Sequence, residues 1–233
     1  MKKILEPLRH PLCASLEIPG SKSVSNRALL LATLADGVSE INNIQVSEDI
    51  RVFIRALTDL GVSLHFDEKA RKVVVRGCQG QGLNKQVKIW CGESGTLARF
   101  MLIACAGLSG SYYFDGAASL RKRPMTSGLQ VLAKQGMICL PETSENLPLA
   151  LHSPVGLAGG KIVVDGSQTG QVISALLMIA PFARSAVTLQ VENLVSRSYV
   201  NLSCSMMAEF GVQVEDLSER EFFVAKPQAY LAQ

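Results

Sequence analysis

Cations and hydroxyl side chains stand together at the predicted start of an apolar helix, in the stretch IPGSKSVSNRALLLATLADG at residues 18–37. Lys22 and Arg27 are interleaved with Ser21, Ser23 and Ser25, and the apolar run ALLLATLA follows. A serine at a helix start caps the helix and contributes about 1 kcal/mol, which accounts for one hydroxyl but not for two cations. The free N–H groups and the dipole of a helix start also attract phosphate and carboxylate groups. The stretch therefore predicts an anion-binding helix start, with simple capping as the alternative.

Two later segments repeat this kind of opening. GESGTLARF begins at Gly92 and GSQTGQVISALLM begins at Gly166, and both place glycine and hydroxyl residues directly before an apolar run. Glycine lets an oxyanion approach the backbone N–H groups closely. A second cationic cluster is LRKRPM at residues 120–125. Each of its two arginines can hold an anion through two parallel hydrogen bonds. Three cations before a proline are also typical of a solvated turn. Together these features predict a site for a small ligand with more than one negative group.

The helix starts belong to a repeated unit, because Gly20, Gly92 and Gly166 are 72 and 74 residues apart. A glycine also ends a later amphipathic helix in each unit, as is usual for left-handed helix termination. These glycines are Gly61, Gly136 and Gly211. The unit is predicted as strand, helix, strand, helix, strand, strand, at about residues 19–80, 81–155 and 156–228. ALLLATLA and SALLMIA are apolar nearly all round, so we expect an α/β fold with buried helices and the sheets outside.

Composition excludes several classes of protein. The 233 residues are 48% hydrophobic and 18% charged, with a net charge of +3, and no run of five like charges favours nucleic acid as a partner. The six cysteines form no CxxC pair and there are only three histidines, so we expect reduced thiols, a cytoplasmic protein and no metal site. No uncharged apolar run approaches the roughly 18 residues that would span a membrane. Charged residues and a proline interrupt the N-terminal stretch MKKILEPLRHP, which therefore does not read as a signal peptide.

Five motifs in this order resemble those of one family. They are LEIPGSKSVSNRALLLATLADG, GESGTLARF, LRKRPM, DGSQTGQVISALLM and LVSRSY. The chain resembles, along its full length, the 5-enolpyruvylshikimate-3-phosphate synthase (3-phosphoshikimate 1-carboxyvinyltransferase) family of the shikimate pathway. The resemblance implies transfer of the enolpyruvyl group of phosphoenolpyruvate to the 5-hydroxyl of shikimate 3-phosphate, through a tetrahedral intermediate and without metal or organic cofactor. It also implies two similar domains, each of three βαβαββ units in an inside-out α/β barrel, which close on the substrates.

The resemblance also implies roles for individual residues. Lys22 would be catalytic and would contact both substrates, while Gly95 and Arg123 would contact phosphoenolpyruvate. Arg99, which matches the arginine of the second motif, would be structural. The residues implied to bind shikimate 3-phosphate are Lys22, Ser23, Arg27, Thr169, Gln171, Ser196 and Tyr199.

The sequence departs from the family pattern at three positions. Glu93 stands where the family usually has Asn beside the phosphoenolpyruvate pocket, so we expect it to be paired, with Arg121 or Lys122 as candidates. Gly170 replaces a serine and Ser198 replaces a proline.

The chain has three repeats where the family would have six. We therefore expect residues 19–233 to be the N-terminal, shikimate-3-phosphate-binding domain, with residues 1–18 a strand or hinge segment that goes with a missing C-terminal domain. Alone, such a chain would be a monomer that binds shikimate 3-phosphate weakly and does not turn over, because general acid–base chemistry needs a positioned donor and acceptor.

Two alternatives remain. One is the sister enzyme that transfers enolpyruvyl to UDP-N-acetylglucosamine. Its opening has Lys-Asn instead of Lys22-Ser23, and it typically carries a cysteine before the Arg-Pro turn, where FDGAASLRKRP has none. The other is a non-catalytic binding half-domain, since fold alone does not determine function.

Overall fold

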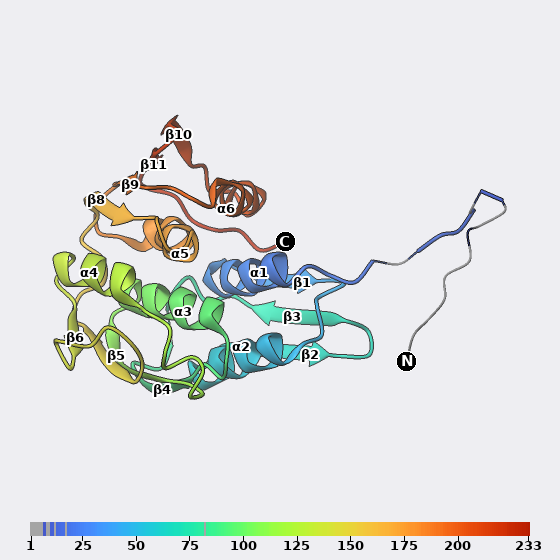
Figure 1. Ribbon diagram of the computed structural model, residues 1–233, viewed down its shortest axis with the longest axis horizontal. Helices are drawn as coiled ribbons and strands as arrows, with labels where there is room; N and C mark the ends of the chain where they lie inside the picture. The colour runs from blue at the N-terminus through green and yellow to red at the C-terminus, as the bar shows by residue number, and fades with distance from the viewer. Residues whose placement is uncertain (1–6, 8–9, 12, 17, 82) are drawn as a thin grey trace.

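The computed structural model describes residues 7, 10–11, 13–16, 18–81 and 83–233 (Figure 1). Three sheets surround a centre of helices. The first sheet holds β1 (Val38–Ile41), β2 (Ser63–Asp67) and β3 (Lys72–Arg76) in the order β1-β3-β2. The second holds β4 (Gln86–Trp90), β5 (Gly110–Asp115), β6 (Ile138–Leu140) and β7 (Leu149–Ser153) in the order β4-β5-β7-β6. The third holds β8 (Gly160–Asp165), β9 (Val187–Glu192), β10 (Glu215–Ser218) and β11 (Glu221–Val224) in the order β8-β9-β11-β10.

Each sheet is accompanied by two helices. They are α1 (Lys22–Leu34) and α2 (Glu48–Asp59), α3 (Gly95–Gly107) and α4 (Thr126–Lys134), and α5 (Gln171–Ile179) and α6 (Arg197–Glu209), with a 3₁₀ turn η1 (Ala180–Phe182) after α5. The element order β4-α3-β5-α4-β6-β7 recurs as β8-α5-β9-α6-β10-β11, and in both sheets the first two strands are parallel and the others antiparallel.

The first helix of each unit forms the core, as expected. Ten consecutive residues of α1, from Ser25 to Leu34, are buried, and so are the eight residues 172–179 of α5. Such helices are apolar all round because other elements cover every face. In contrast, α2, α4 and α6 each bury only part of their surface. The expectation of central helices with outer sheets is therefore confirmed, and the second helix of each unit lies nearer the surface (Figure 1).

The first unit departs from the predicted pattern at its opening strand. Residues 13–16 and 18–21 are described and form no strand, and the rest of the expected segment at residues 1–18 lies partly outside the described residues. Instead, the C-terminal segment lies parallel to the start of β1: the Asp36 N–H donates to the Tyr230 carbonyl at 2.9 Å, and the Ala232 N–H donates to the Asp36 carbonyl at 2.9 Å. The last residues therefore occupy the place beside β1 that β4 and β8 occupy in the other units.

Tyr230 anchors this segment in the core. Its ring is fully buried, and its hydroxyl donates to the Met178 carbonyl at 2.7 Å. Met178 lies in the last turn of α5, where carbonyl groups have no partner within the helix. Burial also raises the pKa of the phenol, which therefore stays a neutral donor. One side chain thus satisfies a helix end and holds the segment that completes the first sheet.

Removing this hydroxyl should destabilise the fold. For Tyr230→Phe we expect the free energy of unfolding to fall by about 1–2 kcal/mol, because the buried Met178 carbonyl loses its partner. Urea unfolding measures the difference. Tyr113→Phe, which removes a hydroxyl from a side chain on the outer face, is the control and should change stability by less than about 0.5 kcal/mol. Equal effects of the two changes would contradict the anchoring role.

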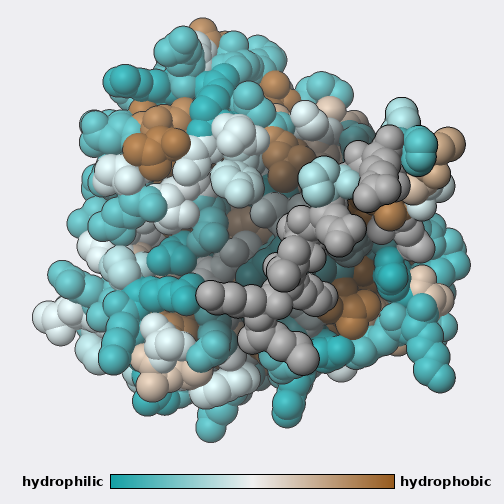
Figure 2. All heavy atoms as spheres, turned by 45° about the vertical axis from the view of Figure 1, so that its right-hand side comes forward, coloured by the Kyte–Doolittle hydropathy of each residue, from teal (hydrophilic) through white to brown (hydrophobic). Residues whose placement is uncertain are grey.

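The face of the molecule shown in Figure 2 is mostly hydrophilic, with apolar side chains in separate small patches. In the described part of the chain, no helix has the length and apolar character needed to cross a membrane.

Candidate anion-binding site

Four helices point their N-terminal ends at one cavity of about 290 Å³. Its wall is built from the starts of α1, α5 and α6, with one contribution from the first turn of α3. The lining residues are Lys22, Ser23, Asn26, Arg27, Thr96, Thr169, Gly170, Gln171, Ser196 and Tyr199. All seven residues that the sequence predicted for shikimate 3-phosphate line this cavity. Gly95 and Arg123 do not line it, but lie next to it beyond Thr96.

The helix starts around the cavity are not neutralised. The first turns of α1, α3, α5 and α6 contain no acidic residue, whereas α2 has Glu48 and Asp49. Unpaired N–H groups make a helix N-terminus equivalent to about half a positive charge. Capping explains Ser94, whose hydroxyl accepts from the Leu97 N–H, but the N-cap side chains Ser21 and Ser196 make no capping bond. Capping also explains Thr169, whose hydroxyl accepts from the Gln171 N–H at 3.1 Å at the start of α5. The capping alternative is therefore wrong for α1, and the uncapped N-terminal ends of α1 and α6 can attract an anion.

Arg27 is the main cation of the cavity and is only 2% exposed. Its Nε donates to the Ser203 hydroxyl at 2.7 Å, and its Nη2 donates to the Ser174 hydroxyl and to the Tyr199 carbonyl, both at 3.1 Å. Its Nη1 donates to the Ser23 carbonyl at 2.9 Å. The guanidinium thus ties α1 to α5 and α6, and the serines of those two helices fix its orientation.

No carboxylate pairs with Arg27 among the described residues. Its neighbours are neutral oxygens and the rings of Phe100 and Tyr199, whose centroids lie 5.4 and 5.9 Å from the guanidinium carbon. Burial lowers the pKa of Arg27 from its ordinary value to about 10, and the group is still a cation at neutral pH. A buried charge without a counter-ion is costly. An anion in the cavity would supply that counter-ion. The unpaired positive charge of Arg27 therefore favours the binding of an anion.

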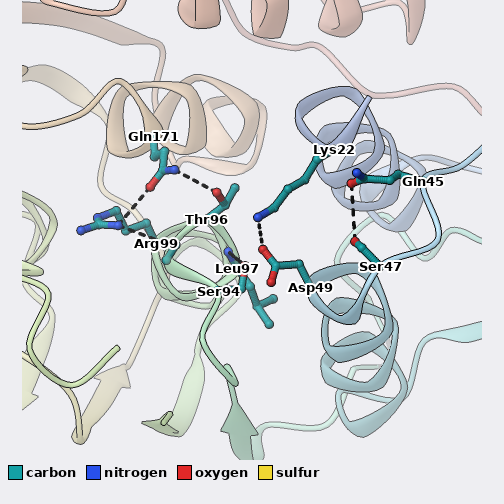
Figure 3. Close-up of polar contacts among 10 residues, drawn as sticks. Lys22, Gln45, Ser47, Asp49, Ser94, Thr96, Leu97, Arg99 and Gln171 are labelled. Atoms are coloured by element: carbon teal, nitrogen blue, oxygen red, sulfur yellow. Dashed lines mark hydrogen bonds and ion pairs between the residues drawn. The ribbon is translucent and has the colours of Figure 1, made fainter. Parts of the chain in front are cut away.

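Lys22 lies at the mouth of the same cavity and is paired with an internal acid. Its ammonium forms an ion pair with Asp49 in the first turn of α2 (Figure 3). The Lys22 side chain is 47% exposed, so this pair is solvated and weak. An incoming phosphate would compete with one carboxylate at a partly exposed position.

A second polar network joins the cavity to the neighbouring arginines. The Gln171 Nε2 donates to the Thr96 hydroxyl at 2.8 Å, and its Oε1 accepts from Arg99 Nη1 at 3.0 Å (Figure 3). Arg99 Nη2 also donates to the Pro124 carbonyl at 2.9 Å. Arg99 therefore fixes both Gln171 and the loop that carries Arg123, which agrees with the structural role expected for it.

Two guanidinium groups converge beside Gly95. A Cβ at this position would lie 2.8 Å from Arg99 Nη1 and 3.1 Å from Arg123 Nη1. The pKa of Arg99 is lowered by burial and by the charge of Arg123. Like charges held this close favour an anion between or beside them. Gly95 and Arg123, predicted together from the sequence, are thus brought together at the start of α3.

Arg121, one of the two partners expected for Glu93, pairs with another residue. Arg121 does not pair with Glu93 but holds Asp115 through two bonds of 2.8 and 2.7 Å. This pairing lowers the pKa of the Asp115 carboxyl. Glu93 instead accepts a hydrogen bond from the Ser119 hydroxyl at 2.9 Å. Its charge therefore stays near the start of α3.

Sequence reasoning missed three polar residues of the site: Asn26, Ser174 and Ser203. Asn26 and Arg27 follow Lys22 and Ser23 at helical spacing, so one face of α1 carries all four, and this spacing could have revealed Asn26. Ser174 and Ser203 lie inside α5 and α6, and no local pattern distinguishes them from other buried serines. Within the described residues, no three His, Cys, Asp or Glu side chains group as metal ligands would.

The fold is that of the enolpyruvyl transferases. The structure is similar to EPSP synthase from Acinetobacter baumannii, with a TM-score of 0.79 and 22% identity, over 93% of this chain and 48% of that one. It is also similar to the enolpyruvyl transferase NikO from Streptomyces tendae, with a TM-score of 0.64 and 13% identity, over 92% of this chain and 49% of that one.

The sequence comparisons define the family within this fold. The model of the EPSP synthase (3-phosphoshikimate 1-carboxyvinyltransferase) family matches residues 8–233, and the chain belongs to that family. It is 40% identical over 228 residues to the 3-phosphoshikimate 1-carboxyvinyltransferase of Nostoc punctiforme, covering 97% of this chain and 53% of that protein. The chain thus spans about half the length of the curated relatives it matches.

Freeing Lys22 from its internal partner should strengthen anion binding. For Asp49→Asn we expect the dissociation constant for inorganic phosphate to fall about twofold to fivefold, because the competing carboxylate is removed. Calorimetric titration at low ionic strength measures the change. The difference between the variants should become smaller as the salt concentration approaches about 0.15 M, because salt then screens exposed charges over about 8 Å. Glu48→Gln, in the same turn of α2, is the control for overall charge. The same gain from both variants would contradict the competition.

Proposed function

We propose that this chain is the shikimate-3-phosphate-binding domain of a 3-phosphoshikimate 1-carboxyvinyltransferase. The reaction transfers the enolpyruvyl group of phosphoenolpyruvate to the 5-hydroxyl of shikimate 3-phosphate and releases phosphate. The observation that carries the proposal is the Arg27 guanidinium, buried without a carboxylate in a cavity to which four helix starts contribute. Such a cavity favours a small anionic ligand, and family membership makes shikimate 3-phosphate the candidate.

The hydroxyl-rich half of the cavity suits the phosphorylated substrate. Thr169, Gln171 and Ser196 would hold the phosphate and hydroxyls of shikimate 3-phosphate, since they combine hydroxyl and amide groups with the starts of α5 and α6. Ser23 and Arg27 would bind the same substrate from α1. Tyr199, which lines the cavity and contacts Arg27 through its carbonyl, would form the pocket wall.

Phosphoenolpyruvate would bind beside this cavity. Arg123 offers a cation, and Gly95 places the start of α3 directly beside two guanidinium groups. Lys22 would contact both substrates. It would act in catalysis by stabilising negative charge at the reacting centre, because an ammonium group stabilises such charge strongly in a site that excludes water. Its present bond to Asp49 indicates that the ammonium is held near the cavity before any substrate arrives.

Turnover would require groups from a second domain. The lining residues include no histidine, aspartate or glutamate, the side chains that most often move protons in enzymes. We propose that a second domain of the family fold supplies the proton donor and acceptor and closes over the substrates. The 233-residue chain alone would then bind without catalysing.

The two alternatives have less support. The relatives compared are named 3-phosphoshikimate 1-carboxyvinyltransferases, which disfavours UDP-N-acetylglucosamine as the acceptor. The likeness to NikO concerns the fold only. A non-catalytic binding half-domain would share the cavity and would differ in failing to gain activity when a complementary second domain is added.

Titration of the chain by NMR tests the proposal. Shikimate 3-phosphate should shift the resonances of Ser23, Arg27, Thr169, Gln171 and Ser196, and UDP-N-acetylglucosamine should not. Shifts with the UDP-sugar alone would favour the sister enzyme. Absence of shifts with both ligands would overturn a preformed half-site.

Variants of the two cations should separate binding from stability. Arg27→Met keeps most of the buried volume and removes a charge that has no counter-ion, but it also takes the donor from four buried acceptors, so the free energy of unfolding should fall by about 1–3 kcal/mol. Affinity for shikimate 3-phosphate should fall about tenfold or more, because a charge-assisted hydrogen bond is lost. Lys22→Ala should also weaken binding, whereas Arg184→Ala, on the exposed surface, should not. Chemical denaturation and calorimetry on the same samples provide both quantities, and equal binding by all three variants would contradict the assignment.

A further inference from the structure

Asn26 is a buried amide without a partner in the wall of the cavity. It lies in α1 directly before Arg27, and its side chain is 1% exposed. Neither Nδ2 nor Oδ1 has a hydrogen-bond partner among the described residues. Asn26 also lines the cavity, together with Lys22, Ser23 and Arg27 from the same helix.

The other buried polar side chains are satisfied. Every buried serine and threonine side chain of the described core takes part in a hydrogen bond, and Arg27 donates four. These residues are Ser25, Thr33, Ser39, Ser94, Ser153, Ser174 and Ser203. Buried polar groups in native proteins are almost always paired, so an exception needs a physical reason. At Asn26 the exception coincides with the wall of the cavity to which the four helix starts contribute.

The chemistry of the amide indicates what it would bind. A phosphate or carboxylate offers only acceptors, which suits the neighbouring Lys22 and Arg27 but would repel the Asn26 Oδ1. A hydroxyl group both donates and accepts, so one hydroxyl can meet Oδ1 and another, or the same one, can accept from Nδ2. The cations of α1 and the amide between them therefore match a ligand with an anionic group beside a hydroxyl.

We propose that Asn26 is a further substrate-binding residue, which recognises a ring hydroxyl of the substrate rather than its anionic groups. The proposal rests on the proposed function, because shikimate 3-phosphate carries free hydroxyls next to its phosphate. Both amide atoms are closed off from solvent, so contact requires a small shift of cavity side chains, a common event on binding. Asn26 would then contribute specificity for the hydroxylated ring, while Arg27 contributes affinity for charge.

Asn26→Leu separates this role from a merely structural one. Leucine has a similar size and removes both unsatisfied polar atoms, so the melting temperature should be maintained or raised. We expect the dissociation constant for shikimate 3-phosphate to rise about tenfold, because the ligand hydroxyl loses its hydrogen-bond partner. The dissociation constant for inorganic phosphate, which has no ring hydroxyl, should change less than about twofold. Calorimetric titration of the 233-residue chain with both ligands gives these values. Asn42→Leu, at an exposed position outside the cavity, is the matched control.

The outcomes distinguish this inference from the proposed function. If the unmodified chain does not bind shikimate 3-phosphate, the proposed function fails and the inference falls with it. If it binds and Asn26→Leu binds equally well, the inference alone is overturned. Equal weakening toward both ligands would also overturn it, because Asn26 would then act on the anion or on the fold. Asn26→Ala, which demands no extra space, gives the same test if the leucine variant does not fold.

Discussion

The rest of the site depends on the hydrogen bonds of the buried Arg27 guanidinium. It joins three helices through neutral oxygens only, two of them serine hydroxyls and two of them backbone carbonyls. A carboxylate in any of these places would have neutralised the charge and stabilised the empty protein. Since none is present among the described residues, the fold keeps a desolvated positive charge at the wall of a cavity. An anion in the cavity would offset the cost of that charge, which favours anions over neutral ligands.

The surrounding elements reinforce the same sign of potential. The first turns that reach the cavity have no acidic residue, and two of their N-cap serines leave the N–H groups uncapped. The acid that pairs with a cation of the cavity, Asp49, lies on the neighbouring helix α2 and holds Lys22 at a partly exposed position. This arrangement places the permanent charge in the interior and the exchangeable ion pair at the entrance. A ligand can therefore displace the weak pair without disturbing the network that holds the core together.

Part of this organisation could be predicted from the sequence, and the reasons differ from element to element. The helix starts at Lys22, Gly95 and Gln171 are marked locally by glycine, hydroxyl residues and a following apolar run, so their approximate positions and their convergence were predictable. The buried character of α1 and α5 followed from the runs ALLLATLA and SALLMIA, which are apolar nearly all round. The segment that pairs beside β1 was not predictable in the same way, because it comes from the other end of the chain. The partner of Arg121 was missed for a related reason: Asp115 ends the preceding strand β5, and only the folded turn brings the two together.

The C-terminal segment links the first and third units of the fold. The segment at Tyr230 lies against β1 and satisfies the end of α5, so the first and third units are joined without a further domain. The serines that orient Arg27 come from this third unit, and the arginine itself comes from the first. Closure of the three units is therefore also what positions the cation. The cavity that results has cations, hydroxyl groups and an unpaired amide on its wall, and its lining residues offer no carboxylate or imidazole to move protons. The cavity therefore has groups suited to binding an anion, while the groups that most often move protons are not among its lining residues.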